Sequence, residues 1–292
     1  MISELQKIDS SLSFEFKTIT TKGDTDTRPL FAMEQKGIFE KEIDRAVANK
    51  EIDFAVHSLK DVPSQIDGDL VISCIPKRES INDVLITKDG FSIDSIPSAS
   101  VIGSSSLRRA VQVTRKRPDL IVKPVRGNIE TRINKVTEGK FDGIVLAQAG
   151  ISSLGGDVKL SELSLEEFPS SPGQGALAIV ARQDNVETIK MLQKIEDIKS
   201  RNEVNAERAL SDTVESGCRF PVGAFAISNG DSLTLKVAVY SMDGKKSIIL
   251  EKTGSMTNAI QLGKSLGIEL KERGVSEIAS NWREELERWN KQ

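Results

Sequence analysis

A cluster of arginines in the middle of the chain holds the residues most suited to chemistry. Six arginines and two lysines lie between Leu107 and Arg132, against two acidic residues, in a protein whose net charge is -3. The first part of this stretch, Gly103-Ser-Ser-Ser-Leu-Arg-Arg109, predicts a short strand, a glycine-serine turn and a helix start. Backbone N–H groups at a helix N-terminus attract anions, and a guanidinium group binds a carboxylate through two hydrogen bonds. The pattern therefore predicts a phosphate or carboxylate site, with a solvated basic helix face as the alternative.

A second arginine-bearing turn follows the first. The segment Val125-Arg-Gly-Asn-Ile-Glu-Thr-Arg132 repeats the order of strand, glycine turn, polar cap and helix. Two such turns facing one cleft would suit a ligand with several carboxylates.

The composition limits the classes of protein to which the chain can belong. Its 292 residues, 38% hydrophobic and 28% charged, suit a soluble protein of two or three domains. No run of about 18 apolar residues predicts a membrane span, and the N-terminus has no signal-peptide pattern. Cys74 and Cys218 lie far apart, which suits a reducing cytoplasm, and the single His57 excludes a multi-histidine metal site. Mild acidity and 4% aromatic residues argue against nucleic-acid binding.

Hydrophobic periodicity predicts two α/β lobes with parallel sheets. The strands and helices expected in this part are strands at 13–20, 52–56, 70–75, 84–87, 101–102, 142–147 and 176–181, and helices at 2–8, from 36 onward, and at 185–195. Segments near 77–82 and 168–173 would cross between the lobes, and clefts commonly form between such lobes.

The last part of the chain has a different pattern. Strands at 224–228, 233–241 and 247–252, separated by Asn-Gly and Asp-Gly, predict an antiparallel meander between helices at 201–213 and 259–273. The expected domains are a first lobe at 1–78 and 172–197, a second lobe at 82–168, and an α+β domain at 198–292.

Three further motifs accompany the two arginine turns: Asp53-Phe-Ala-Val-His-Ser-Leu-Lys-Asp-Val-Pro-Ser64, Pro172-Gly-Gln-Gly-Ala176 and Glu215-Ser-Gly-Cys-Arg-Phe-Pro-Val-Gly223. In their order and spacing, these five motifs together resemble the porphobilinogen deaminase (hydroxymethylbilane synthase) family. The resemblance covers nearly the whole chain. It implies two lobes like those of periplasmic binding proteins, followed by a third domain.

The resemblance implies a transferase that condenses four porphobilinogen units on a dipyrromethane primer and releases ammonia and hydroxymethylbilane. It also implies that Cys218 carries this cofactor through a thioether. Read alone, a cysteine in a Gly-Cys-Arg turn is more often structural, although the neighbouring Arg219 would favour its thiolate. Cys74, within a strand, is expected to be structural.

By the same resemblance Asp61 is the catalytic carboxylate, which stabilises positive charge on the pyrrole N–H and helps to move protons. From the residues alone, Asp61 can equally be a helix N-cap. The implied ligands of the cofactor are Lys60, Ser106, Arg108, Arg109 and Arg126, and those of the substrate are Lys36, Arg132 and Gln174. His57 is expected to be structural.

The chain departs from the family pattern at three places. It begins inside the first helix, without the usual strand and Arg-Gly-Ser turn, so we expect the native start to lie further upstream. Ala32 and Ser153 stand where many members have a lysine and an arginine.

The alternatives to a transferase are a non-catalytic carboxylate-binding protein, like a solute receptor, and an inactive truncated paralogue. A cytoplasmic monomer is expected, with no nucleic-acid or membrane partner.

Overall fold

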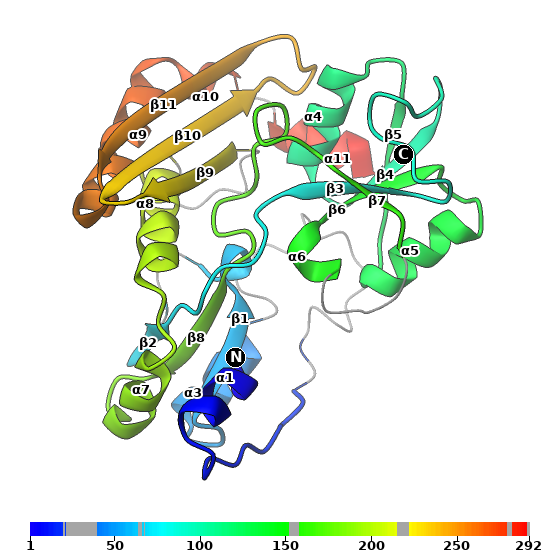
Figure 1. The fold of residues 1–292 in the computed structure, drawn as a ribbon. Coiled ribbons are helices and arrows are strands. Elements are labelled where there is room, and N and C mark those ends of the chain that lie inside the picture. Colours follow the sequence, from blue (N-terminus) through cyan, green and yellow to red (C-terminus); the bar gives the residue numbers. More distant parts are fainter. Residues whose placement is uncertain are drawn as a thin grey trace. The chain divides into compact units, whose positions relative to one another are not determined.

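The computed structural model of the chain describes residues 1–19, 21, 40–63, 66, 68–151, 158–214, 222–278 and 282–290. The chain forms two compact units (Figure 1). Unit 1 comprises Met1–Glu79 and Ala176–Val204, and unit 2 comprises Ser80–Gly175 and Asn205–Gln292. The division into three domains stays a prediction.

Unit 1 is built on a three-stranded sheet in the order β1-β8-β2. Its elements are α1 (Ile2–Ile8), α3 (Lys41–Ala48), β1 (Phe54–Ser58), the 3₁₀ helix η2 (Leu59–Asp61), β2 (Leu70–Cys74), β8 (Leu177–Arg182), α7 (Val186–Gln193) and the first part of α8 (Ile198–Val214). Both β1 and β2 pair antiparallel with β8. The expected parallel pairing of β1 is therefore wrong, because β8 comes from a later passage of the chain and runs in the opposite direction.

The central strand β8 is covered on both faces. Ala178 and Val180 point into clusters with Leu59 and Val47, whereas Ile179 and Ala181 point into a cluster with Leu5. A strand buried on both faces has a continuous apolar sequence, which is why this strand could be predicted.

The prediction of a strand at 13–20 is wrong for residues 13–19, the part of this range that the structure describes, because they form no strand. Phe14 packs edge-on against Phe54, with ring centroids 6.4 Å apart, but Phe16 is 80% exposed. Alternation marks two faces of an extended segment, whereas a strand also needs a neighbouring backbone to bond. The helix expected from Lys36 is described only from Lys41, because residues 22–39 lie outside the described part of the chain.

Unit 2 contains a five-stranded sheet in the order β5-β4-β6-β3-β7. The elements of this part are β3 (Asp83–Thr87), β4 (Val101–Ser104), α4 (Leu107–Lys116), β5 (Ile121–Pro124), α5 (Ile129–Thr137), β6 (Gly143–Ala147), α6 (Gln148–Ile151) and β7 (Leu160–Glu162). β4 pairs parallel with β5 and β6, but β3 pairs antiparallel with β6 and β7. The sheet is thus mixed rather than parallel, because an apolar run marks a buried strand without fixing the direction of its neighbours.

Helices cover both faces of this sheet. Leu85 packs on one face with Val113 of α4, whereas Val84 and Ile86 pack on the other with Val136 of α5. Asp83 precedes Leu85 by two residues, so its side chain points to the face that α4 covers. This register brings an acidic residue beneath the arginines of α4.

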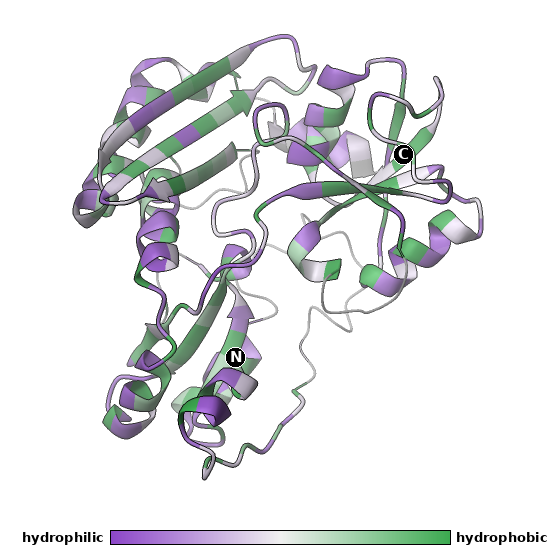
Figure 2. Ribbon diagram, in the orientation of Figure 1, coloured by the Kyte–Doolittle hydropathy of each residue, from purple (hydrophilic) through white to green (hydrophobic). Residues whose placement is uncertain are grey.

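The second part of unit 2 is an antiparallel sheet in the order β11-β10-β9, which confirms the predicted meander. Its elements are β9 (Val222–Asn229), β10 (Ser232–Tyr240), β11 (Ser247–Ser255), the 3₁₀ helix η3 (Met256–Asn258), α9 (Ala259–Glu272), α10 (Val275–Ile278) and α11 (Trp282–Asn290). Hydrophobic and hydrophilic residues alternate along β10, as Figure 2 shows.

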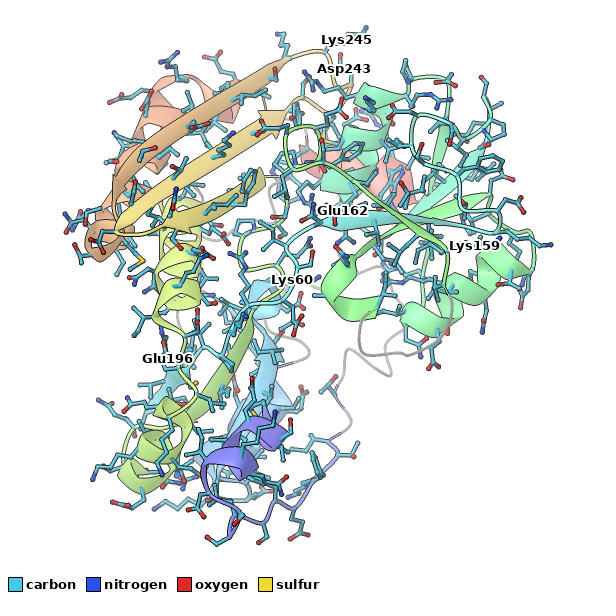
Figure 3. The ribbon with its side chains drawn as sticks, in the orientation of Figure 1. Lys60, Lys159, Glu162, Glu196, Asp243 and Lys245 are labelled. Carbon is cyan, nitrogen blue, oxygen red and sulfur yellow. The ribbon has the colours of Figure 1, made fainter. Side chains whose placement is uncertain are left out.

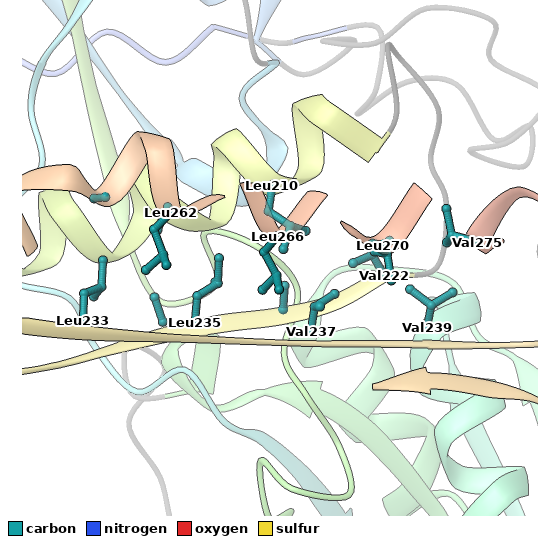
Figure 4. Packing of buried hydrophobic residues seen from close by; sticks show 14 residues of the cluster. Leu210, Val222, Leu233, Leu235, Val237, Val239, Leu262, Leu266, Leu270 and Val275 are labelled. Carbon is teal, nitrogen blue, oxygen red and sulfur yellow. The ribbon is translucent and has the colours of Figure 1, made fainter. Parts of the chain in front are cut away.

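The core of this part lies between the sheet and the helices α8 and α9 (Figure 4). Leu210 of α8 and Leu266 of α9 meet Leu235 and Val237 of β10 there. The two helices cross closely, since a Cβ atom on Gly263 would lie 2.2 Å from the carbonyl oxygen of Ala206. None of the helices formed by the described residues is both long and apolar enough to cross a membrane.

Candidate functional site

The first arginine turn has the predicted order of strand, serine turn and helix. The hydroxyl of Ser104 accepts the Ser106 N–H at 3.1 Å and donates to the Ser106 carbonyl at 3.0 Å, which closes the turn between β4 and α4. Ser106 takes the N-cap position with an extended backbone, but its side chain caps no N–H group. Its hydroxyl has no hydrogen-bond partner among the described residues, so it can bond a ligand.

Arg108 and Arg109 are each only 6% exposed, so the alternative of a solvated basic face is wrong for these two residues. Arg108 donates to Asp83 Oδ2 at 2.8 Å and to the Pro169 carbonyl at 2.7 Å. Its Nη1 also donates to Gln112 Oε1 at 3.0 Å, and Arg109 Nε donates to Asp83 Oδ1 at 2.9 Å. Two guanidinium groups therefore share one buried carboxylate.

The Asp83 carboxylate is fully buried and ionised. Burial raises the pKa of Asp83, but the charges of Arg108 and Arg109 outweigh this effect and hold the pKa well below its usual range. Gln174 completes the network, since its amide donates to Asp83 Oδ1 at 2.9 Å and its oxygen accepts from Arg109 Nη2 at 3.1 Å. The Gln174 side chain thus lies inside the protein, at 0% exposure.

The second arginine turn joins β5 to α5. Gly127 has a φ of 116°, which favours glycine, and Asn128 caps α5 by accepting the Thr131 N–H at 2.8 Å. Arg132 donates to the Gly127 carbonyl at 2.6 Å and to the Ser105 hydroxyl at 2.8 Å. The last bond connects the two arginine turns directly.

Arg132 lies among positive charges. Burial lowers the pKa of Arg132, and the charges of Arg109 and Arg126 lower it further. Within the described ranges, its guanidinium bonds neutral oxygens and no carboxylate pairs with it. We call Arg109, Arg126 and Arg132 the cationic cluster. Asp83 compensates Arg109, so a bound anion would relieve the repulsion between these like charges chiefly at Arg132.

Three of the remaining cations of the stretch make contacts that hold the fold together. Arg115 lies over the Tyr240 ring at 4.8 Å, and Arg117 pairs with Asp119 at 2.7 Å. Lys116 pairs with Glu167 at 2.7 Å and with Asp94 at 3.2 Å. These contacts separate a structural part of the basic stretch from the cationic cluster.

Asp61 lies in unit 1, at the end of η2. The Leu59 N–H donates to the Ala176 carbonyl at 2.9 Å, and Leu59 and Val62 are buried at 1% and 6% exposure. These buried residues flank Lys60 and Asp61, which are both exposed; Figure 3 labels Lys60 in the turn after β1. Asp61 is the last residue of η2, so the alternative of a helix N-cap is wrong.

Asp61 interacts electrostatically with the titratable Glu40 of unit 1. Burial raises the pKa of Glu40, which is 4% exposed, and the negative charge of Asp61 raises it as well. His57 is 7% exposed and its Nε2 lies 2.9 Å from Asp44 Oδ1, so its ring is packed inside unit 1 and hydrogen-bonded there. Asp61 is therefore an exposed carboxylate at the edge of an acidic group.

Several predicted positions lie outside the described residues: Cys218, Lys36, Ala32 and Ser153. Cys74 is buried, and burial together with the Glu196 carboxylate raises the pKa of its thiol to about 12. In the described residues no three His, Cys, Asp or Glu side chains gather as metal ligands would.

Two acidic residues that organise the buried network were not among the residues predicted from the sequence. Asp83 and Glu207 are both 0% exposed. An acidic residue next to an apolar run, as in Asp83-Val-Leu-Ile, is the one signal that the sequence offers for such a role.

Two family models cover most of the chain. The model described as porphobilinogen deaminase, dipyromethane cofactor binding domain, matches residues 1–190, and the model of the porphobilinogen deaminase C-terminal domain matches residues 201–272. A probable porphobilinogen deaminase of Nitrosopumilus maritimus is 64% identical over 291 residues, which cover 100% of this chain and 94% of that protein. The porphobilinogen deaminase of Bacillus subtilis is 38% identical, over 98% of this chain and 92% of its own length.

Solved structures of binding proteins are also similar, at a low level. The extracellular-binding protein of a probable amino-acid ABC transporter from Bacillus subtilis is 12% identical, with a TM-score of 0.34 over 66% of this chain and 78% of that one. A TM-score this low does not establish a relationship. The family models and the full-length relatives establish one: this chain belongs to the porphobilinogen deaminase family, the hydroxymethylbilane synthases of tetrapyrrole biosynthesis.

Proposed function

We propose that Asp61 is the catalytic carboxylate of this transferase, and that Cys218 holds its dipyrromethane cofactor through a thioether. The reaction of the family joins four porphobilinogen units in steps and releases ammonia and hydroxymethylbilane. The observation that supports the proposal most is the cationic cluster of Arg109, Arg126 and Arg132.

The cationic cluster fits the chemistry of the cofactor and the substrate. Each pyrrole unit has an acetate and a propionate group, so a chain of such units needs several fixed cations. When bound, the dipyrromethane supplies the free pyrrole carbon to which the first substrate unit is joined. Arg132 suits this task because it is partly buried and its guanidinium is bonded to neutral oxygens, so a carboxylate would relieve the repulsion from its neighbours.

The other predicted ligands divide by exposure. Lys60 is exposed and the Ser106 hydroxyl has no bond in the described part of the chain, so both suit direct contact with a carboxylate. Arg108 and Gln174 are buried, and we propose that they act on the ligands through Arg109 and Asp83. Lys36 remains a proposed substrate ligand from the family resemblance alone.

Asp61 would act where positive charge develops. As the C–N bond of the aminomethyl group breaks, the pyrrole N–H becomes electron-poor, and a fixed carboxylate stabilises that charge. The carboxylate also accepts a proton from the new ring junction, or passes one to the leaving amine. The buried residues Leu59 and Val62 on either side fix the backbone that presents Asp61.

Replacing Asp61 with asparagine tests this role. We expect Asp61→Asn to keep its cofactor, measured as intact mass, while turnover falls by about 10² or more, because one electrostatic contact of the transition state is lost. Asp53→Asn is the matched control, since Asp53 is an exposed aspartate at the other end of β1. Full turnover in Asp61→Asn would contradict the role, and ligand binding without turnover in the unaltered protein would favour a receptor.

The attachment to Cys218 is tested by mass. We expect the unaltered protein and Cys74→Ala to exceed their sequence masses by one dipyrromethane, and Cys218→Ala to match its own. A modified peptide that contains Cys74 instead, or no added mass in any protein, would contradict the attachment.

We also propose that the enzyme works as a monomer in the cytoplasm, without nucleic-acid or membrane partners. Light scattering at micromolar concentration should give a single species near the 31.9 kDa of one chain. A stable dimer would contradict the first part of this proposal.

A further inference from the structure

Glu207 is a fully buried carboxylate whose two oxygens both accept backbone hydrogen bonds. Its Oε2 accepts the Gly173 N–H at 2.7 Å and its Oε1 accepts the Ala226 N–H at 2.8 Å. Burial of a polar side chain is costly unless it is hydrogen-bonded, and these two bonds offset that cost for Glu207, which is 0% exposed. The two donors belong to segments that lie 53 positions apart in the sequence (226 minus 173).

The first donor leads to the cationic cluster. Gly173 has a φ of 76°, in the turn that precedes β8, and the next residue is Gln174. The Gln174 amide bonds both Asp83 and Arg109. Glu207 therefore fixes the backbone from which the partner of Arg109 extends.

The second donor lies on the outer edge of β9. Among the strands of the described residues β9 pairs only with β10, so alternate N–H groups of β9 face away from the sheet. The Ala224 N–H donates to the Ser170 carbonyl at 2.8 Å, and the Ala226 N–H donates to Glu207. This edge is thus covered by the 169–173 segment and by Glu207.

The packing at the start of β9 is tight. A Cβ atom on Gly223 would lie 2.6 Å from the Pro169 carbonyl oxygen. The same carbonyl accepts bonds from Arg108 and Gln112 at 2.7 and 3.0 Å. One segment, 169–174, therefore contacts the arginines of α4, the start of β9 and the carboxylate of α8.

We propose that Glu207 is a positioning residue that holds the start of β9 in a fixed place relative to Arg109. β9 begins at Val222, four residues after Cys218 in the sequence. Its place therefore limits where a group on Cys218 lies relative to the cations that bind its carboxylates. The inference rests on the proposed roles of Cys218 and Arg109, and it adds a residue that touches neither ligand.

Glu207→Gln tests the proposal. Glutamine keeps the length of the side chain but presents an NH₂ donor to one of the two backbone N–H groups, so one bond is lost. We expect cofactor attachment, followed by intact mass as apoprotein is converted to holoprotein, to slow at least tenfold. We also expect the KM for porphobilinogen in the loaded enzyme to rise at least fivefold, with a smaller change in kcat.

Glu203→Gln is the matched control, because Glu203 lies one turn earlier on α8, is 7% exposed and makes neither of these bonds. Glu207→Asp, which keeps the charge but shortens the reach, gives a second test if the amide variant does not fold. A purely structural role would lower the melting temperature while leaving attachment rate and KM at the control values well below that temperature. That result, in whichever Glu207 variant folds, would overturn the proposal.

Failure of the proposed function would be seen separately. If the unaltered protein holds nothing on Cys218, the attachment itself is wrong. If the unaltered protein is loaded and the Glu207 variants match the control in attachment rate and KM, then the positioning role is wrong while the attachment stands.

Discussion

Asp83→Asn is the substitution for which the structure gives the clearest expectation. The change keeps the shape of the side chain but removes the charge that two guanidinium groups share. Arg108 and Arg109 are 6% and 7% exposed at their side chains and Asp83 is 0% exposed, so water cannot replace the lost carboxylate. One oxygen also becomes an NH₂ donor that faces the Arg108 donor.

The expected loss follows from this geometry. Removing one partner of a buried ion pair costs about 3–5 kcal/mol, because the other charge is left uncompensated. Two cations depend on Asp83, so we expect the upper end, about 5 kcal/mol, which is a large share of the roughly 5–15 kcal/mol that stabilises a typical domain. Arg108→Met in the same protein removes one uncompensated charge and should restore part of the loss.

Urea unfolding followed by circular dichroism measures this loss. Glu166→Gln serves as the control, since Glu166 pairs with Lys236 but is 74% exposed, and it should change the midpoint little. A loss below about 1 kcal/mol for Asp83→Asn would refute the reasoning, because it would mean that the site is solvated or that the arginines have other partners.

The pH dependence has a definite sign. The two arginines hold the pKa of Asp83 below its usual range, despite burial, so the stabilisation is present above the unfolded value of about 3.9. It is lost only as the pH falls through the lower pKa of the folded state. The difference between the unaltered protein and Asp83→Asn should therefore be constant from about pH 5 to 8 and shrink in acid.

Three further predictions concern single positions. The thiol of Cys74, whose pKa burial raises to about 12, should not react with Ellman's reagent at pH 8 until the protein unfolds. Under the proposed attachment of the cofactor to Cys218, unfolded holoprotein should then show one thiol. Two thiols would contradict the attachment. Gly263→Ala should lower the free energy of unfolding by about 3 kcal/mol in urea titrations, because its Cβ would lie 2.2 Å from the Ala206 carbonyl oxygen. An unchanged midpoint would mean that the two helices can separate to make room. Asn128→Ala should cost about 1 kcal/mol in the same assay, since it removes the cap of α5, and no loss would mean that solvent replaces the cap.

The parts of the fold that could be predicted are those with a local cause. The apolar runs of β3, β6 and β8 reflect strands buried on both faces, and the Asn-Gly and Asp-Gly turns fix the meander of β9 to β11. The direction of pairing has no local cause, because it depends on which later segment lies beside a strand. For this reason β1 was expected in a parallel sheet and lies antiparallel to β8.

The candidate site shows the same limit more sharply. The local sequence places Arg108 and Arg109 after a serine turn, and that placement is confirmed, but the buried carboxylate that they share lies about 25 positions earlier in the chain. Asp83 reaches them because it precedes Leu85 by two residues, and so points to the face of the sheet that α4 covers. The sequence shows that Asp83 is acidic and that it shares a strand face with Leu85. It does not show that α4 covers this face and so brings Arg108 and Arg109 to Asp83.

A local count of charge therefore overstates what the basic stretch can offer to a ligand. The sequence shows an excess of six positive charges between Leu107 and Arg132. In the folded chain three acidic residues from outside this stretch, Asp83, Asp94 and Glu167, pair with Arg108, Arg109 and Lys116. Within the stretch, Asp119 pairs with Arg117. Arg132 differs from these residues, since within the described part of the chain it bonds neutral oxygens while Arg109 and Arg126 repel it. The capacity to bind carboxylates thus depends less on how many arginines the motif contains than on which of them the rest of the chain leaves without an acidic partner.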